Sequence, residues 1–460
     1  MNASLRRPPG PNAPFWGIPL LRQMSRDYLG FSERLLAEHG DVVHMKFGKE
    51  HCYELFHPEL IRQALVEHSK NIVRWERGIE VFEQVHGQSV LVTEGETWQR
   101  QRRMLQPGFG PKRMAGYARR MVAAASHALD SLPDRNDQVL DFEHAMTLLT
   151  MDVIMRTLFS SDAHQDALVA EQAVGVITRV GMEEMFWAFT LPDWMPHKSR
   201  KRWAKRTLDE LIWRHIRERR AAPGARQGDG GDDDLLAMLT GIRDEEGDGR
   251  GLSDTEVRDQ CMTIFLAGHE TTAAALTWWG WAMASNPECA RRATEEVDRV
   301  LGARLPTHED VPSLTYLTQT LKEAMRLYPP APALMSRRLT APMRLGEWQV
   351  PAGAMLRITT WVMQRDPRWF DNPTRFDPDR FSPEGLARQV RGSYMPFGVG
   401  PRVCIGSIFA MTEMTLVAAM LLQRHSLHPA GAGVPTPRVN VTLRPAEGMP
   451  LRLVRRTGTG

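Results

Sequence analysis

Cysteine is scarce in this chain, and the N-terminal segment lacks a long apolar run. The 460 residues include only four cysteines, at positions 52, 261, 289 and 404, with no close spacing between them. This scarcity argues against a disulfide framework and is typical of proteins from a reducing compartment. Near the N-terminus the longest apolar run is broken by Pro19, so no segment there is long enough for a signal peptide or a membrane anchor. We therefore expect a soluble, cytoplasmic protein.

Excess charge of either sign is also missing. The formal net charge at pH 7 is only +3, which gives no support to nucleic-acid binding. Hydrophobic residues make up 42% of the chain and charged residues 25%, the usual mixture of a globular protein. The length allows one large domain with a sizeable core or a few ordinary domains.

The pattern of apolar residues predicts a mostly helical fold with a small β region. Alternating apolar residues in 41–48 and 51–56 predict a pair of strands. Helical periodicity dominates 98–220 and again 253–328. Beyond Pro329, repeated prolines and short alternating runs predict short strands and irregular structure.

Two polar segments bear on the number of domains. Residues 1–15 are rich in proline and predict an extended arm. Residues 221–234 are polar and rich in glycine, which fits either a domain boundary or a surface loop between two helices. We favour the loop because helical patterns continue on both sides. We therefore expect residues 1–460 to form a single domain, with a last helix at about 405–425.

One predicted helix is unusually long. Ser253 and Glu256 have the spacing of a capping box at its start, and Pro287 predicts its end. The interval is roughly 30 residues, or about 45 Å of helix, which would cross the whole molecule.

The residues at the centre of this helix are not those that helix stability alone would favour. Gly268 costs about 1 kcal/mol relative to alanine in a helix interior, and Glu270 and Thr271 interrupt an apolar run. A membrane span would rarely carry His269 and Glu270. A solvent-facing polar stripe is a second interpretation. The third is functional, because glycine lets a ligand approach the backbone beside an acid and a hydroxyl.

A lone cysteine lies in the glycine-rich stretch FGVGPRVCIG, residues 397–406. Cys404 has no second cysteine nearby for a disulfide, and neither sulfur nor histidine close by for a zinc site. A structural buried cysteine would be the plainest interpretation.

Three further patterns are weak when taken singly. Glu323 and Arg326 lie three residues apart on one helix face, the usual arrangement of an exposed ion pair. Trp98 and Arg102 share a face at a spacing of four. Arg380 stands between aromatic residues, which suggests that it is at least half-buried.

The order of these patterns resembles the cytochrome P-450 haem-thiolate monooxygenases over essentially the full chain. AGHETT is similar to the family's oxygen-activating segment, EAMR to its E-x-x-R element, and the Trp98–Arg102 pair to its W-x-x-x-R element. Arg380 matches the arginine that completes the triad with Glu323 and Arg326. The haem-binding loop of the family is matched at six positions: Phe397, Gly398, Gly400, Arg402, Cys404 and Gly406.

The resemblance implies that Cys404 is the axial thiolate ligand of the iron in haem b. Backbone N–H groups of a glycine-rich turn that opens a helix can stabilise a thiolate, and thiolate donation favours cleavage of dioxygen. Trp98, Arg102 and Arg402 would be partners of the haem propionates. A further arginine is implied at Arg337, although variable spacing leaves Arg338 open.

The resemblance also implies roles for the centre of the long helix and for the triad. Glu270 and Thr271 would be the acid–alcohol pair that delivers protons to oxygen. Ala267 and Gly268 would contact the haem, with the glycine leaving room above the iron. The triad would be buried and mutually satisfied. One departure is Gln364, which stands where many relatives carry histidine, and its role stays open.

The implied reaction is insertion of one oxygen atom from O2 into an apolar substrate, by hydroxylation or epoxidation. The regions that set specificity in the family are apolar here, and fatty acids, terpenoids and steroids remain open. Residues of these regions are Val81, Phe82, Val85, Phe186, Phe189, Leu191, Ala333, Leu334 and Met335.

Electrons are expected from a separate ferredoxin or flavodoxin with its reductase, because no flavin domain is apparent, and we expect a monomer. A basic patch could steer an acidic partner; its members would be Arg100, Arg103, Lys112, Arg113 and Arg391. Two rival functions are a peroxide-driven peroxygenase and a non-catalytic haem sensor or carrier. Neither needs the acid–alcohol pair, which is intact here.

Overall fold

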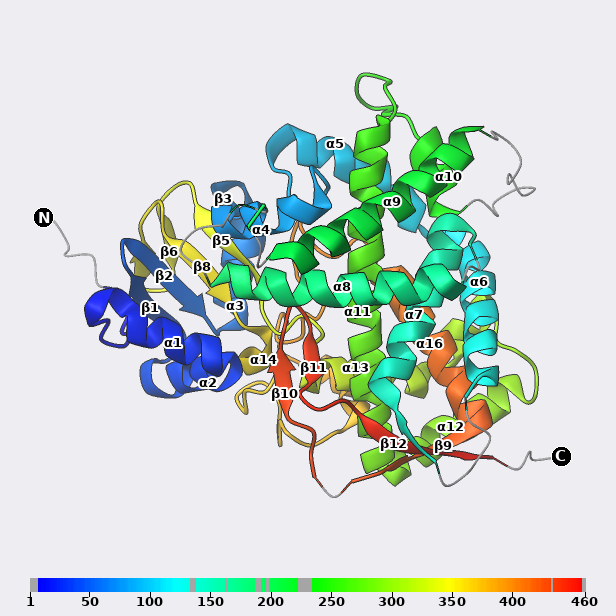
Figure 1. Ribbon diagram of the computed structural model, residues 1–460. Coiled ribbons are helices and arrows are strands. Elements are labelled where there is room, and N and C mark those ends of the chain that lie inside the picture. Colours follow the sequence, from blue (N-terminus) through cyan, green and yellow to red (C-terminus); the bar gives the residue numbers. More distant parts are fainter. Residues whose placement is uncertain are drawn as a thin grey trace, which may run out of the picture.

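The computed structural model describes residues 7–132, 138–161, 164–186, 192, 194–195, 198–221, 234–431 and 433–456. Helices dominate, as expected; the largest sheet lies to one side of them, and the C-terminal strands lie in the lower part of the view (Figure 1). The α-helices are α1 Ile18–Arg26, α2 Tyr28–His39, α3 Pro58–Arg62, α4 Glu76–His86, α5 Gly95–Leu105, α6 Pro111–Asp130, α7 Phe142–Phe159, α8 His164–Met185, α9 Ser199–Ala221, α10 Leu235–Gly241, α11 Asp254–Ser285, α12 Pro287–Leu301, α13 Thr315–Leu327, α14 Thr360–Met363, α15 Pro383–Arg388 and α16 Ser407–Arg424.

The predicted long helix is α11, which runs through the middle of the molecule (Figure 1). Its capping box forms as expected: the Glu256 N–H donates to Ser253 Oγ at 3.2 Å, and the Ser253 N–H donates to the Glu256 carboxylate at 2.8 Å. The helix ends at Ser285, two residues before Pro287. Because α7, α9, α13 and α16 pack around it, most of its side chains are buried.

The predicted strand pair is also confirmed. β1 Val42–Phe47 and β2 Glu50–Leu55 pair antiparallel through a turn at Gly48, whose φ of 59° favours glycine. They belong to a five-stranded sheet with the order β1-β2-β8-β5-β3. The other strands of this sheet are β3 Ile72–Arg74, β5 Leu334–Leu339 and β8 Met355–Ile358.

Smaller sheets complete the β region after Pro329, together with one strand in the helical half that was not predicted, β4. The C-terminal strand β12 pairs with β9 and with β4, and β10 and β11 form a hairpin. These strands are β4 Val139–Asp141, β6 Met343–Leu345, β7 Trp348–Val350, β9 His425–Pro429, β10 Pro437–Val439, β11 Leu443–Pro445 and β12 Pro450–Arg455.

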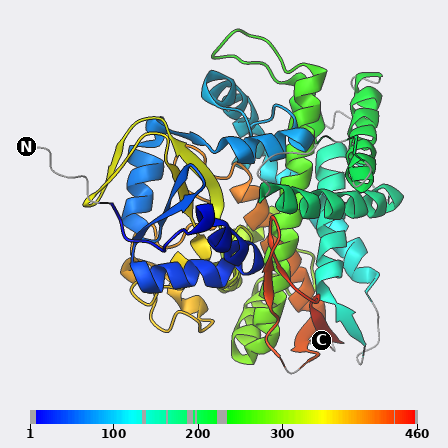
Figure 2. The same cartoon turned by 60° about the vertical axis from the view of Figure 1, so that its left-hand side comes forward.

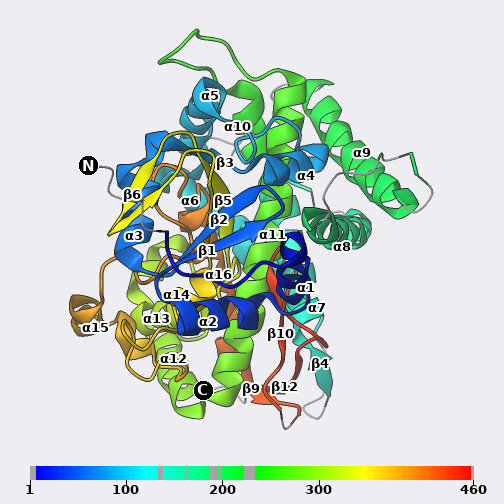
Figure 3. The ribbon, with the colours of Figure 1, turned by 90° about the vertical axis from the view of Figure 1, so that its left-hand side faces the viewer.

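The five-stranded sheet and the helices around α11 form two neighbouring regions of one domain. The sheet lies to the left of α11 in Figures 1 and 2, and α6 and α7 lie on its other side. Figure 3 looks onto the sheet side, where α2 packs beside β1. A continuous apolar core joins residues from Leu20 to Leu453, which is consistent with a single folding unit.

The two polar segments are described only in part. Residues 7–14 of the expected arm contain no helix or strand, and the carbonyl of Pro9 accepts a hydrogen bond from the N–H of His44 at 2.8 Å. The predicted loop 221–234 lies almost wholly outside the described residues. None of the helices in the described ranges is long and apolar enough to cross a bilayer.

Candidate active site

A large cavity lies between α11, the Cys404 loop and the five-stranded sheet. Its volume is about 1800 Å³, larger than the roughly 300–1,000 Å³ of a typical small-molecule pocket. It therefore has room for more than one ligand. All six residues of the expected substrate pocket line it: Val81, Phe82, Val85, Ala333, Leu334 and Met335. Phe186 lines it too, whereas positions 189 and 191 lie outside the described residues.

The Cys404 loop is a tight turn that leads into α16. Gly398 and Gly400 have φ angles of 73° and 79°, and a Cβ on Gly400 would lie 2.2 Å from the carbonyl oxygen of Leu65. Only glycine fits there. The Cys404 N–H donates to the carbonyl of Phe397 at 3.0 Å, which fixes the cysteine just before the helix begins.

The Cys404 side chain is open to the cavity but is otherwise surrounded by protein. Burial raises the pKa of its thiol, while the backbone N–H of Gly406 and the charge of Arg102 act in the opposite direction. No cluster of three or more His, Cys, Asp or Glu side chains that could hold a metal ion occurs within the described residues. A metal at Cys404 would therefore have to bring other ligands with it, as the iron of a haem does.

Four of the arginines that line the cavity lie close to one another: Arg74, Arg102, Arg337 and Arg402. Arg74 and Arg337 stand directly opposite each other on β3 and β5, although like charges in such a cross-strand pair are destabilising. Burial lowers the pKa of Arg74 to about 9, and the charges of Arg402 and Arg337 add to this effect. Burial likewise lowers the pKa of Arg402 to about 10.

The anions near these four arginines are too few for the positive charge. Glu94 pairs with Arg402 and lies 3.6 Å from Arg74, and the Nε of Arg74 is buried without a partner. Trp98 stacks 3.8 Å beneath the Arg402 guanidinium. Such a cluster fits a ligand with two carboxylates, which would compensate the crowded cations.

The neighbouring arginines 337 and 338 have different surroundings. Arg338 is held by ion pairs with Glu50 at 2.7 Å and Glu76 at 2.8 Å. Arg337 donates to the carbonyls of Met335 and Ser336, and burial lowers its pKa. Arg337 is therefore the better placed of the two to meet an anionic ligand.

The centre of α11 lines the cavity with Ala267, Gly268, Glu270 and Thr271. The hydroxyl of Thr271 donates to the carbonyl of Ala267 at 2.7 Å. A Cβ on Gly268 would lie 3.1 Å from Ile154 Cδ1 on α7. Close packing of α7 against α11 thus favours a small residue here, and the room above the iron that the resemblance implies for this glycine stays a prediction.

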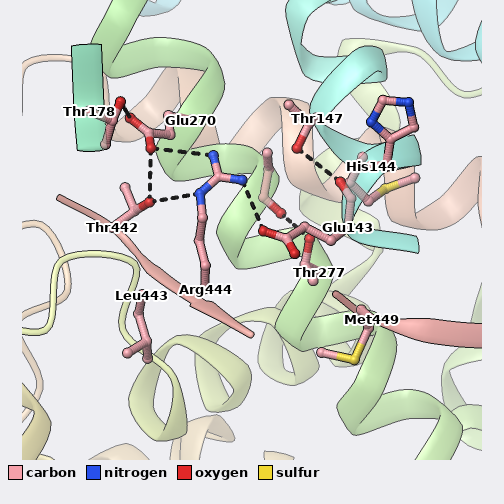
Figure 4. A network of polar contacts seen from close by, with 12 residues as sticks. Glu143, His144, Thr147, Thr178, Glu270, Thr277, Thr442, Leu443, Arg444 and Met449 are labelled. Atoms are coloured by element: carbon pink, nitrogen blue, oxygen red, sulfur yellow. Dashed lines mark hydrogen bonds and ion pairs between the residues drawn. The ribbon is translucent and has the colours of Figure 1, made fainter. Parts of the chain in front are cut away.

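Glu270 is held from two sides (Figure 4). Its carboxylate accepts hydrogen bonds from the hydroxyls of Thr178 on α8 and Thr442 next to β11, each at 3.2 Å, and from Arg444 at 3.3 Å. Burial raises the pKa of Glu270, and these three donors act against that rise.

The three residues of the expected triad meet in the core. Arg326 Nε and Nη2 donate to the Glu323 carboxylate at 2.7 and 2.8 Å, and both side chains are fully buried. Arg380 Nε lies 3.4 Å from the same carboxylate. Arg326 also donates to the carbonyls of Gln364 and Pro373, so its guanidinium is well supplied with acceptors. The Nε of Arg380 is buried without a hydrogen-bond partner, although it lies within ion-pair distance of Glu323.

The structure gives Gln364 a structural role. Its side-chain amide donates to the carbonyls of Met325 and Arg326 and accepts from the N–H of Met395, all at 3.0–3.1 Å. Gln364 thereby joins the end of α13 to the chain that leads into the Cys404 loop.

Two members of the expected basic patch are already neutralised. Arg103 is held by Asp244 at 2.7 Å, and Arg100 by Glu256 at 2.8 Å. Sequence spacing did not reveal these partners, because Asp244 lies before α11 and Glu256 in its first turn, both far along the chain from α5. Lys112 and Arg391 are exposed, so a steering surface would have to rest mainly on them.

A thiol beside a cavity that also receives four arginines and the centre of α11 fits the arrangement that the sequence predicts for a haem-thiolate site. The comparisons agree: the cytochrome P450 family profile matches residues 8–451. Cyclooctatin synthase of Streptomyces melanosporofaciens is 36% identical over 94% of both chains. Cyclooctat-9-en-7-ol 5-monooxygenase of the same organism is 34% identical over 86% of this chain and 84% of its own. Pentalenene oxygenase of Streptomyces avermitilis is 32% identical over 87% of both chains.

The chain belongs to the cytochrome P450 family. It is a haem-thiolate monooxygenase that uses O2 and acts on apolar substrates. The sequence analysis missed Arg74, Thr178, Thr442 and Arg444, because each is an isolated residue whose partners come from distant segments.

Proposed function

We propose that this P450 hydroxylates or epoxidises a cyclic terpenoid. The observation that carries the proposal is the apolar wall that joins Cys404 to Val81, Val85 and Leu334 in one cavity of about 1800 Å³. Such a wall excludes water and gives a polycyclic hydrocarbon the contacts it needs. The names of three relatives refer to cyclooctatin, cyclooctat-9-en-7-ol and pentalenene, which supports a terpenoid over a fatty acid or a steroid.

The cofactor in this proposal is haem b, which when bound activates O2 for insertion of one oxygen atom. Cys404 would be its axial ligand, with the thiolate stabilised by the Gly406 N–H and by Arg102. Gly406 has open space where a side chain would stand, and a flat macrocycle packed there would account for that glycine.

The propionates would lie among Arg74, Arg102, Arg337 and Arg402, together with the indole N–H of Trp98. Each carboxylate would then receive charge-assisted hydrogen bonds, and the buried Nε of Arg74 would gain the partner that it lacks. The same contacts would hold the macrocycle in the cavity between the Cys404 loop and α11.

Thr271 and Glu270 would handle protons. The Thr271 hydroxyl faces the cavity from α11, so by turning from the Ala267 carbonyl it can hold a water molecule there. The Glu270 carboxyl behind it can pass a proton to that water, which is positioned general acid catalysis worth about 10²–10⁴-fold.

Two electrons would come from a ferredoxin or flavodoxin and its reductase, without a flavin bound to this chain. Exposed Lys112 and Arg391 could attract such an acidic partner. The scarcity of cysteine, with all four thiols unpaired, supports a cytoplasmic location. We expect the protein to act as a monomer.

The test combines a spectrum with a product assay. The reduced carbon monoxide complex should show the red-shifted Soret band of thiolate ligation, and Cys404→His should abolish it. Supplied with O2, a ferredoxin and its reductase, the protein should oxidise pentalenene or cyclooctat-9-en-7-ol, as measured by mass spectrometry. Product formed only with hydrogen peroxide would indicate a peroxygenase. Ligand-induced spectra without any product would indicate a sensor or carrier.

A further inference from the structure

Glu270 is held by elements that lie outside its own helix. Its two carboxylate oxygens accept three hydrogen bonds, from Thr178, Thr442 and Arg444, and all three are long, at 3.2–3.3 Å. The neighbouring Thr271 is not one of these three donors, because its hydroxyl donates to the carbonyl of Ala267 instead. Glu270 is thus restrained weakly, in a position from which it can turn.

Arg444 lies between two carboxylates (Figure 4). Its Nη1 donates to Glu143 on α7 at 2.9 Å, and its Nη2 donates to Glu270 at 3.3 Å. Its Nε donates to the Thr442 hydroxyl at 3.3 Å. The planar guanidinium can serve both acids at once. The hydrogen bond of Arg444 to Glu143 is shorter than its hydrogen bond to Glu270. Arg444 therefore keeps an anionic partner when the Glu270 side chain turns away.

The charges in this pocket are not balanced. One guanidinium faces two largely buried carboxyls, whose side chains are 16% exposed for Glu143 and 8% for Glu270. Burial raises the pKa of each carboxyl, and Arg444 lowers both. Asp141 raises the pKa of Glu143 and Arg438 lowers it. Burial lowers the pKa of His269, the residue before Glu270, to about 4, so His269 stays neutral.

We propose that Arg444 is the positioning residue for proton delivery by Glu270. It holds the Glu270 carboxylate between α8 and the C-terminal hairpin β10–β11, and it retains Glu143 as its partner when Glu270 turns toward Thr271. Glu143 thereby competes with Glu270 for one cation. This inference rests on the proposed monooxygenase function, but its central measurement does not require turnover.

The competition predicts opposite effects for two variants. Arg444→Gln removes the cation, so the apparent pKa of the Glu270 carboxyl should rise by about 1 or more. Glu143→Gln leaves the guanidinium to Glu270 alone, so the same pKa should fall. Arg444→Lys keeps a positive charge and should restore much of the wild-type value.

Infrared difference spectroscopy during a pH titration measures this pKa directly, with the Glu270 carboxyl band assigned by its loss in Glu270→Gln. Arg452→Gln is the matched control, because Arg452 is an exposed arginine on β12. If Arg444 only fastens the hairpin to α7, the Glu270 titration should be the same in all variants. Shifts in the same direction for Arg444→Gln and Glu143→Gln would also overturn the proposal.

Oxygen consumption with a ferredoxin and its reductase gives a second measurement. In Glu143→Gln the tighter hold on Glu270 should lower kcat several-fold and enlarge the solvent isotope effect, with an unchanged KM for the ferredoxin. An unchanged kcat and isotope effect would contradict the positioning role. A wild-type protein without a thiolate spectrum would instead refute the proposed function, while the infrared titration would still report on Arg444.

Discussion

Two clusters of buried charge in this protein have opposite character. In the core, Glu323 and Arg326 form two short hydrogen bonds, and the remaining donors of Arg326 are used by backbone carbonyls. At the cavity, four arginines lie close together beside the carboxylate of Glu94. They are Arg74, Arg102, Arg337 and Arg402. In the first cluster the carboxylate of Glu323 is shared by two arginines and Arg326 is held by backbone carbonyls, whereas the second cluster has four arginines beside the carboxylate of Glu94. Burial alone therefore does not distinguish a structural charge from a binding site, but the ratio of cations to neighbouring carboxylates does.

The largest expected effect comes from breaking the core cluster. Glu323→Ala leaves the fully buried Arg326 and the partly buried Arg380 without their carboxylate, which should destabilise the fold by about 3–5 kcal/mol. Urea denaturation followed by circular dichroism measures this loss, and the haem content on purification should fall with it.

A matched control exists on the surface. Glu288 and Arg291 have the same spacing of three residues on α12, but both side chains are exposed. Glu288→Ala should leave the denaturation midpoint unchanged. Equal stability of the Glu288→Ala and Glu323→Ala variants would show that the core cluster is no stronger than a surface ion pair.

A smaller effect, confined to haem binding, is expected for the cavity cluster. Arg74→Gln removes one of the crowded cations, so the stability of the haem-free protein should not fall. The loss of one charge-assisted hydrogen bond to a propionate should weaken haem binding by about 1.5–3 kcal/mol, roughly 10- to 100-fold.

Transfer of haem to apomyoglobin measures this change, and the exposed Arg452→Gln is the control. A variant that loses stability but keeps its haem would place Arg74 with the structural charges instead.

The two clusters also show how far sequence analysis reaches. Local patterns predicted α11, its capping box, the first strand pair and the loop around Cys404, because neighbouring residues determine each of these. The pairs Glu288–Arg291 and Glu323–Arg326 have identical spacing, so spacing could not tell that only the second is buried. Its burial depends on the distant segment that supplies the carbonyl of Pro373.

Isolated residues were beyond prediction for the same reason. Arg74 joins the cavity cluster only through the pairing of β3 with β5. Arg444 meets Glu270 only because the C-terminal hairpin reaches α11. The neutralisation of Arg103 by Asp244 is a third case of a contact set by the tertiary fold.

A third prediction applies the same reasoning to hydroxyl groups on α11. Thr271 and Thr277 each donate to the carbonyl one turn earlier, at 2.7 Å, but only Thr271 lines the cavity. If the Thr271 hydroxyl assists proton delivery, Thr271→Ala should bind haem and consume oxygen normally while the ratio of product to hydrogen peroxide falls about tenfold or more.

Thr277→Ala removes an equivalent backbone hydrogen bond and should keep the wild-type ratio. Equal ratios in both variants would mean that Thr271 has only the structural role that its hydrogen bond describes.

The smallest effect is expected at the surface, where paired and unpaired arginines can be compared. Arg391 is exposed, whereas Arg103 is held by Asp244. If an acidic electron donor is steered by free positive charge, Arg391→Glu should slow its association several-fold at low ionic strength. Arg103→Glu should have a weaker effect on association, because the charge of Arg103 is already compensated.

Stopped-flow reduction at increasing salt tests this difference, since screening within about 10 Å at 0.1 M ionic strength should bring the rates together. Association of the wild-type protein that does not depend on ionic strength would rule out electrostatic steering by either arginine.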